Sequence, residues 1–272
     1  FSFKQFNFYR VFTPYMNSKI FYLSQLIIVP TILGLRSTFQ KAIQKRVGSD
    51  RHGKKISESA YFGTQYLLLS IVACYVVIDQ KILTSKAIYR DYLLSGPTLS
   101  QQYYMMLQFG VYIAASIFLL SDTRKLNADF GVMVVHHIVT LTLLYLGWDL
   151  KLYNISITTT ALHDVSDVIL EYSKIFYYKN MKKTSNVMFC IFAVVFMSTR
   201  LFLFPKFIIL PWNNNVFKDA LGFWPYSALH TRVIPIILSV LVLLHSIWSF
   251  FILRVIRNMF RGTKLGDLYE TD

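Results

Sequence analysis

The chain of 272 residues is 54% hydrophobic and 17% aromatic, and its mean hydropathy is +0.44. One soluble core of this size could not bury so many long apolar runs, so the composition excludes an ordinary soluble domain and predicts an all-α, polytopic membrane protein. Lys and Arg total 28 against 14 Asp and Glu, and they lie mostly between the apolar runs. This placement favours membrane lipid or an anionic substrate as partner over nucleic acid, for which no motif is present.

Seven apolar segments approach the length of about 20 residues that a hydrocarbon core requires. In chain order they cover residues 20–35, 57–78, 103–120, 130–146, 152–170, 186–204 and 233–253. Pro30 and Gly34 interrupt the first segment, which could instead be a re-entrant or interfacial helix. Residues 205–232 are expected to form a polar loop with aromatic anchors. The prediction is therefore one bundle of about seven transmembrane helices.

The loops between these segments alternate between the two sides of the membrane. The larger share of Lys and Arg falls on the side that holds residues 36–55 and the C-terminal tail. Because basic loops favour the cytoplasm, this side is predicted to be cytoplasmic, and the turn near residues 147–151 is predicted to be lumenal. No internal repeat or long linker is present, so a single domain is expected.

Two ionisable clusters interrupt the fourth and fifth apolar segments. The fourth holds the adjacent pair His136 and His137, and the fifth holds His163, Asp164 and Asp167. Ionisable groups are costly in a membrane interior, and those that occur there usually serve function. These five residues are therefore the candidates for a functional site.

The two clusters are predicted to lie at one depth in the bundle. A short turn centred near Leu150 joins the two segments, and His136 precedes it by as many residues as Asp164 follows it. With a rise of about 1.5 Å per residue, both clusters lie about 20 Å from the turn, and His136 is expected to face Asp164. Spacings of three and four residues place His163, Asp164 and Asp167 on one side of their helix.

Several interpretations of this set of residues are open. In catalysis, an imidazole oriented by a carboxylate could take a proton from a nucleophile or attack an acyl carbon itself. Two or three His and two Asp could also bind a metal, but His52 and His245 lie in unrelated segments and no metal is expected. A proton or ion pathway is a third use, and a hydrogen-bonded network that only holds two helices together is the structural alternative.

The run DFGVMVVHHIVT at residues 129–140, followed by LHDVSD at residues 162–167, resembles the hallmark motif of the ceramide synthases within the TLC-domain family. An HHxxT element together with an HDxSD element is far more specific than either alone. The run KKISESAY at residues 54–61 is similar to the opening of a TLC domain. The resemblance implies a TLC domain over residues 54–257, an N-terminal segment over residues 1–53 with the first span and a basic loop, and a cytoplasmic tail over residues 258–272.

This resemblance implies acyl-CoA-dependent N-acylation of a sphingoid base, giving a ceramide or dihydroceramide, in the membrane of the endoplasmic reticulum. Acyl-CoA would be a co-substrate, with no bound cofactor, and the protein could work as a homo- or hetero-oligomer. The expected catalytic residues are His136, His137, His163, Asp164 and Asp167. One paired histidine, by preference His136, would attack the thioester to give an acyl-imidazole, or would act only as a general base. Replacing Asp164 or Asp167 by Asn is expected to abolish turnover in a folded protein.

Three basic residues are candidates for binding the CoA phosphates. Lys182 and Lys183 lie in a predicted cytoplasmic loop, where basic residues are common for reasons of topology alone. Arg200 lies inside the sixth apolar segment, where it could pair with a carboxylate, receive an anionic group or extend to the membrane surface. The alternative function is a non-catalytic TLC-domain protein that binds or transports lipid.

Overall fold

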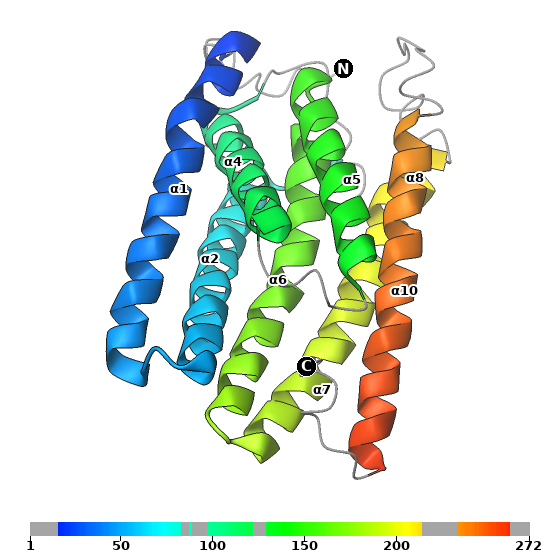
Figure 1. Cartoon of the computed structure of the whole chain (residues 1–272). Helices are drawn as coiled ribbons and strands as arrows, with labels where there is room; N and C mark the ends of the chain where they lie inside the picture. The colour runs from blue at the N-terminus through cyan, green and yellow to red at the C-terminus, as the bar shows by residue number, and fades with distance from the viewer. Residues whose placement is uncertain (1–15, 83–86, 89–96, 122–128, 214–232, 262–272) are drawn as a thin grey trace, which may run out of the picture.

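The computed structural model describes residues 16–82, 87–88, 97–121, 129–213 and 233–261, and the regular structure of these residues is helical (Figure 1). The long helices are α1 (Ser18–Val47), α2 (Arg51–Asp79), α4 (Leu99–Ser121), α5 (Phe130–Asp149), α6 (Tyr153–Tyr178), α7 (Lys182–Met197) and α10 (Ile234–Phe260). The predicted polytopic helical bundle is thus confirmed.

The first apolar segment forms a single continuous helix rather than a re-entrant one. Asn17 begins α1 by accepting a hydrogen bond from the backbone of Lys19, and the helix then runs for 30 residues with Pro30 inside it. Membrane helices tolerate an internal proline, whose ring removes one backbone donor, when local adjustments satisfy the freed carbonyl. The apolar side chains of Leu26 and Ile27 point away from the bundle.

Helix α7 continues beyond the predicted end of its span. Two π-helical segments, η3 (Ser198–Leu203) and η4 (Pro205–Ile209), and the short α8 (Leu210–Asn213) extend it. The expectation of a loop from residue 205 is therefore wrong for the part of that segment that the structure describes, while residues 214–232 lie outside it. Wide π turns inside a helix are frequent at functional sites, and η3 carries Arg200.

Helix α6 is the most enclosed element of the bundle. Six of the described helices are long and apolar enough to cross a membrane, and α6 is not among them. It carries the motif residues and the Glu171–Lys174 ion pair, whose atoms are 2.6 Å apart. In Figure 1 it runs through the middle of the bundle, and it packs mainly against α2 and α7, with further contacts to α4, α5 and η3. These neighbours shield its polar side chains from lipid.

A tight turn sets the relative height of α5 and α6. Lys151 adopts a left-handed backbone conformation with φ of 59°, and the backbone N–H of Leu152 donates to the carbonyl of Gly147 over 2.8 Å. This is the hydrogen bond that closes a helix with a left-handed residue at its end. A Cβ atom on Gly147 would lie 2.1 Å from Ser156 Oγ, so a larger residue here would require the Ser156 side chain to move.

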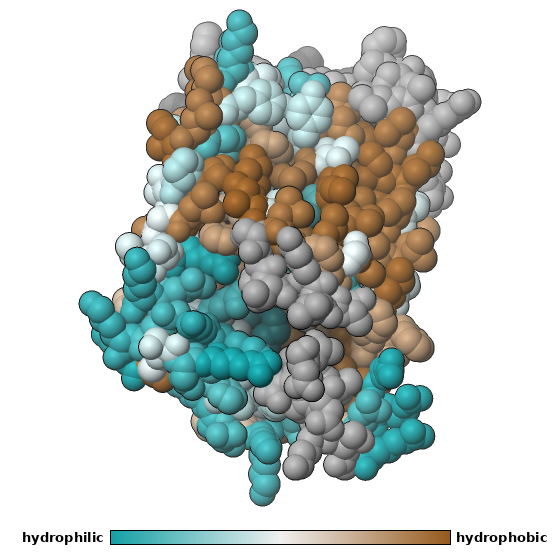
Figure 2. Space-filling model, in the orientation of Figure 1, coloured by the Kyte–Doolittle hydropathy of each residue, from teal (hydrophilic) through white to brown (hydrophobic). Residues whose placement is uncertain are grey.

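Polar side chains gather at one end of the bundle. Figure 2 shows an apolar surface over the upper and central part, and hydrophilic surface at the α1–α2 turn and at the end of α10. The last turns of these helices carry Lys45, Arg46 and Arg257, and the α6–α7 turn lies at the same end in Figure 1. The alternation of loops has the form that the sequence predicted, and the cytoplasmic assignment of this end stays a prediction.

Candidate functional site

The three motif residues of α6 lie at one level of the bundle, but each contacts a different helix. His163 meets α10, Asp164 meets α4 and Asp167 meets η3. All three are on the expected part of α6, and they diverge because α6 is surrounded by helices. With α5, which carries the paired histidines, the site is therefore assembled from α4, α5, η3 and α10 around α6 rather than from the α5–α6 hairpin alone.

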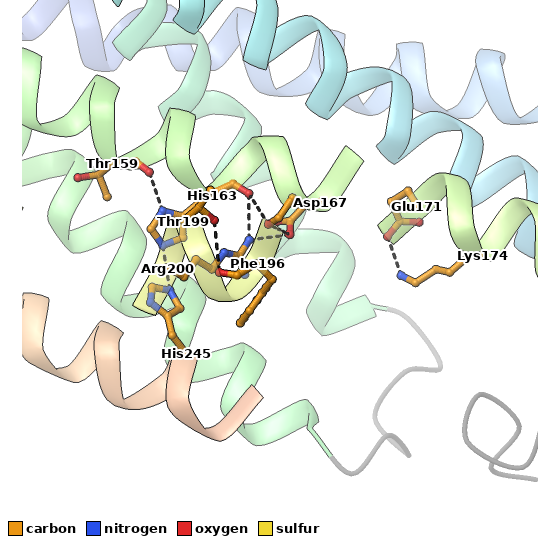
Figure 3. A network of polar contacts seen from close by, with 10 residues as sticks. Thr159, His163, Asp167, Glu171, Lys174, Phe196, Thr199, Arg200 and His245 are labelled. Carbon is orange, nitrogen blue, oxygen red and sulfur yellow. Dashed lines mark hydrogen bonds and ion pairs between the residues drawn. The ribbon is translucent and has the colours of Figure 1, made fainter. Parts of the chain in front are cut away.

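Asp167, which is partly buried, forms an ion pair with the buried Arg200 (Figure 3). Arg200 Nη2 donates to Asp167 Oδ1 over 2.6 Å and to the carbonyl of His163 over 3.0 Å, while Ser166 Oγ donates to the same carboxylate over 3.2 Å. The guanidinium also lies 4.3 Å from the ring centre of Phe196. Arg200 thus neutralises Asp167 and fixes η3 to α6, which is the carboxylate pairing that the sequence allowed.

His163 is hydrogen-bonded to a histidine that the sequence analysis set aside. His163 Nε2 lies 2.8 Å from Nε2 of His245 on α10, a fully buried residue (Figure 3). The expectation that His245 is unrelated to the site was wrong, because no sequence spacing relates two helices that are 82 residues apart. The signal that could have found it is a single ionisable side chain in the middle of an otherwise apolar span.

A contact with Thr159 shows which ring nitrogens of His163 and His245 carry a proton. His163 Nδ1 lies 2.6 Å from the carbonyl of Thr159, so a neutral His163 carries its proton on Nδ1 and has a lone pair on Nε2. His245 must then donate from its own Nε2. Both ring nitrogens of His163 are thereby occupied: the Thr159 carbonyl fixes the tautomer of His163, and His245 donates to the lone pair that this tautomer leaves on Nε2.

The paired histidines of α5 differ in their surroundings. His137 Nδ1 is 3.0 Å from Ser116 Oγ on α4. His136 packs edge to face on Trp248 of α10 at 5.1 Å between ring centres, and it makes no hydrogen bond to any residue that the structure describes. No hydrogen bond or ion pair joins it to Asp164 within the described ranges, so the direct facing expected from the hairpin is not present.

Helix α4 supplies three polar side chains that the sequence analysis did not select. Tyr104 Oη is 2.9 Å from Thr160 Oγ1, and Gln108 Nε2 donates to Asp164 Oδ2 over 3.0 Å. Tyr112 packs beside both paired histidines, at ring distances of 6.5 and 5.9 Å from His136 and His137. The four-residue spacing puts all three side chains on one face of α4. Through this face, α4 contacts both the paired histidines of α5 and Asp164 of α6.

An apolar cavity adjoins this polar level. It comprises about 580 Å³ of space, part of it open to the outside. Tyr112, Thr160 and His163 line its polar end, and apolar side chains of α5, α6 and α10 line most of the remainder. Gly147 also lines it, so the cavity extends from the polar residues toward the α5–α6 turn.

The other candidate residues lie elsewhere. Lys182 and Lys183 are the first residues of α7 and are exposed at the end of the bundle that carries the basic turns. Within the described part of the chain, no three His, Cys, Asp or Glu side chains are grouped so that they could hold a metal ion.

Comparison with known proteins decides the family. A family model described as the TLC domain matches residues 55–254, a range that contains the motif residues of α5 and α6 and also Arg200. The chain belongs to the TLC-domain family. The match leaves α1 outside and begins within α2, close to the range 54–257 that the sequence resemblance implied.

Several relatives of this TLC-domain chain are ceramide synthases. Ceramide synthase 4 of Bos taurus is 31% identical over 254 residues, which are 92% of this chain and 63% of the relative. Ceramide synthase 3 of Mus musculus is 28% identical over 79% of this chain and 55% of the relative. Ceramide synthase LOH2 of Arabidopsis thaliana is 32% identical over 64% of this chain and 59% of the relative. The chain therefore spans about three fifths of the length of these relatives.

Proposed function

We propose that this chain transfers an acyl group from acyl-CoA to the amine of a sphingoid base in the endoplasmic reticulum membrane, forming a ceramide or dihydroceramide. The observation that carries the proposal is the set of His and Asp side chains at one level inside a membrane bundle, where His163 lines the polar end of an apolar cavity. The reaction has to open a thioester, deprotonate an amine and hold a long acyl chain away from water. The similarity to ceramide synthases supports the same reaction.

His136 is the best candidate for the nucleophile. His137 Nδ1 is bonded to Ser116, and both ring nitrogens of His163 are occupied, whereas His136 has no hydrogen-bond partner among the described residues. A nucleophilic nitrogen needs an uncommitted lone pair, and of the three motif histidines only His136 has both ring nitrogens free of hydrogen bonds to the described residues.

The proposed reaction has two steps. A ring nitrogen of His136 attacks the thioester carbon, the C–S bond breaks, and the imidazole proton passes to the departing thiolate of CoA. The amine nitrogen of the sphingoid base then attacks the acyl carbon, the bond to the imidazole breaks, and one amine proton returns to the ring. In the alternative, the amine attacks the thioester directly and His136 only accepts its proton.

For the CoA phosphates we propose Lys182 and Lys183. Their side chains are exposed at the basic end of the bundle, where a water-soluble nucleotide could reach them. Arg200 is 5% exposed and already paired with Asp167, so binding a phosphate there would break a buried ion pair.

Incubation of the purified chain in lipid nanodiscs with labelled acyl-CoA and sphinganine tests the function. Mass spectrometry of the lipid extract is expected to find the N-acylated base, with free CoA released in equal amount. If sphinganine and acyl-CoA bind but neither ceramide nor CoA appears, the chain is a lipid-binding TLC-domain protein rather than an acyltransferase.

His245 provides a test of the tautomer argument. His245→Phe removes the donor to His163 while keeping an aromatic ring, and we expect kcat for ceramide formation to fall at least about tenfold. The amide N–H of His245→Gln can still reach His163 Nε2, so this variant is expected to recover most of the loss. His52→Gln, at an exposed position near the start of α2, is the control. Equal rates for His245→Phe and the unmodified protein would contradict the positioning role.

A further inference from the structure

The two aspartates of α6 differ in how their charge is balanced. Asp167 is paired with Arg200 at 2.6 Å. Asp164 is only 1% exposed and has no ion-pair partner among the residues that the structure describes. Its hydrogen-bond donor there is the neutral amide of Gln108. A buried carboxylate is costly without a positive partner, and the described residues place no cationic side chain in contact with Asp164.

Gln108 carries a second unsatisfied group at the same place. The residue is fully buried, its Nε2 is used by Asp164, and its Oε1 has no hydrogen-bond partner in the described part of the chain. Gln102, also fully buried on α4, shows the usual arrangement: its Oε1 accepts from the backbone N–H of Met16 and its Nε2 donates to the carbonyl of Pro97. The two buried glutamines of α4 thus differ, and only Gln108 has an acceptor left over among the described residues.

Residues close to these two acceptors line the polar end of the cavity. His163 immediately precedes Asp164, Thr160 lies one helical turn before Asp164, and Tyr112 lies one helical turn after Gln108. A group that enters the cavity with a positive charge and several hydrogen-bond donors would satisfy both the carboxylate and the amide oxygen.

We propose that Asp164 and Gln108 bind the ammonium group of the sphingoid base, an assignment that rests on the proposed N-acyltransferase function. A primary ammonium brings one positive charge and three N–H donors, whereas a thioester brings neither. Asp164 accepts a proton from the ammonium, so one N–H bond breaks, one O–H bond forms and the nitrogen lone pair becomes available for attack. Gln108 Oε1 accepts a hydrogen bond from the remaining NH₂ and aims the nitrogen.

Steady-state kinetics with sphinganine and acyl-CoA varied separately test this assignment. Gln108→Met keeps the length of the side chain but removes the acceptor, and we expect the KM for sphinganine to rise about tenfold or more while the KM for acyl-CoA is unchanged. Gln102→Met, the matched control on the same helix, is expected to leave both constants unchanged. A Gln108→Met variant with unchanged sphinganine KM, or with both constants raised equally, would overturn the proposal.

A binding measurement covers the case in which Gln108→Met does not fold. In Asp164→Asn, which is nearly isosteric, sphinganine is expected to lose its ability to raise the melting temperature of the protein, while acyl-CoA keeps it. Stabilisation by sphinganine equal to that of the unmodified protein would reject the ammonium site. If the unmodified protein binds sphinganine at this site but forms no ceramide, the proposed function fails and the binding site stands.

Discussion

Asp167→Asn is expected to abolish ceramide formation and to destabilise the protein, whereas Asp164→Asn should abolish ceramide formation in a protein of nearly normal stability. The two positions differ because Asp167 neutralises the buried guanidinium of Arg200. Removing one partner of a fully buried ion pair leaves the other charge uncompensated and costs about 3–5 kcal/mol. The cost here is lower, because the Asp167 side chain is 25% exposed while that of Arg200 is buried. Asp164 has no such partner among the described residues, and Asn can still accept the hydrogen bond from Gln108. The sequence alone predicted a folded protein in both cases, and the ion pair changes that expectation for Asp167.

Thermal melting of the purified variants, measured together with product formation, checks this difference. The double variant Asp167→Asn with Arg200→Gln removes the uncompensated charge, so it should recover a large part of the lost stability but no activity. Equal melting temperatures for Asp164→Asn and Asp167→Asn would show that the pair contributes little to folding. Normal turnover by either single variant would remove that aspartate from the catalytic set.

The helical bundle and most of its spans could be predicted because apolar length is a local property of the sequence. Helix α6 was predicted as well, although its polar side chains lower its hydropathy, and it lies inside the bundle because other helices surround it. The prediction failed at the end of α7. The continuation of α7 through Pro205 into π-helical segments has no signal in composition, because proline at the start of a helical segment and proline in a loop look alike.

The candidate site was predictable only in part for a similar reason. The residues of α5 and α6 could be found because they are ionisable and lie in a short hairpin whose geometry fixes their depth. Their partners Gln108 and His245 come from helices that are distant in sequence, and nothing in a single sequence gives the rotation of α4 or α10 about its axis. The expected contact between His136 and Asp164 is absent for the same reason. The hairpin sets the depth of each residue in the bundle, but it does not set the rotation of each helix about its axis.

His136 and Asp164 contact different helices, which indicates that they bind different substrates. His136 on α5 lies against Trp248 of α10, while Asp164 on α6 is held by Gln108 of α4. Under the proposed function, the acyl group would be bound at the first position and the amine at the second. Tyr112 packs beside the paired histidines, lines the cavity and lies one helical turn after Gln108 on α4.

The largest effect is expected from His136. If His136 is acylated, acyl-CoA alone should release one equivalent of CoA and leave an adduct on the protein before any sphingoid base is added. Intact-mass analysis is expected to find this adduct in the unmodified protein and in Asp164→Asn, because the amine site is not needed for the first step. The adduct should be absent from His136→Ala, since none of the other described histidines of the motif has both ring nitrogens free of hydrogen bonds.

His137→Ala is the matched control, because it removes the neighbouring imidazole and its contact to Ser116 but leaves His136 in place. Addition of sphinganine to the acylated protein should then discharge the adduct as ceramide, and in Asp164→Asn this second step alone should fail. A protein that turns over fully but never carries an acyl adduct would assign His136 the role of general base in a direct attack by the amine. An adduct that persists in His136→Ala would instead move the nucleophile to His137 or His163, and the free ring of His136 would then need another explanation.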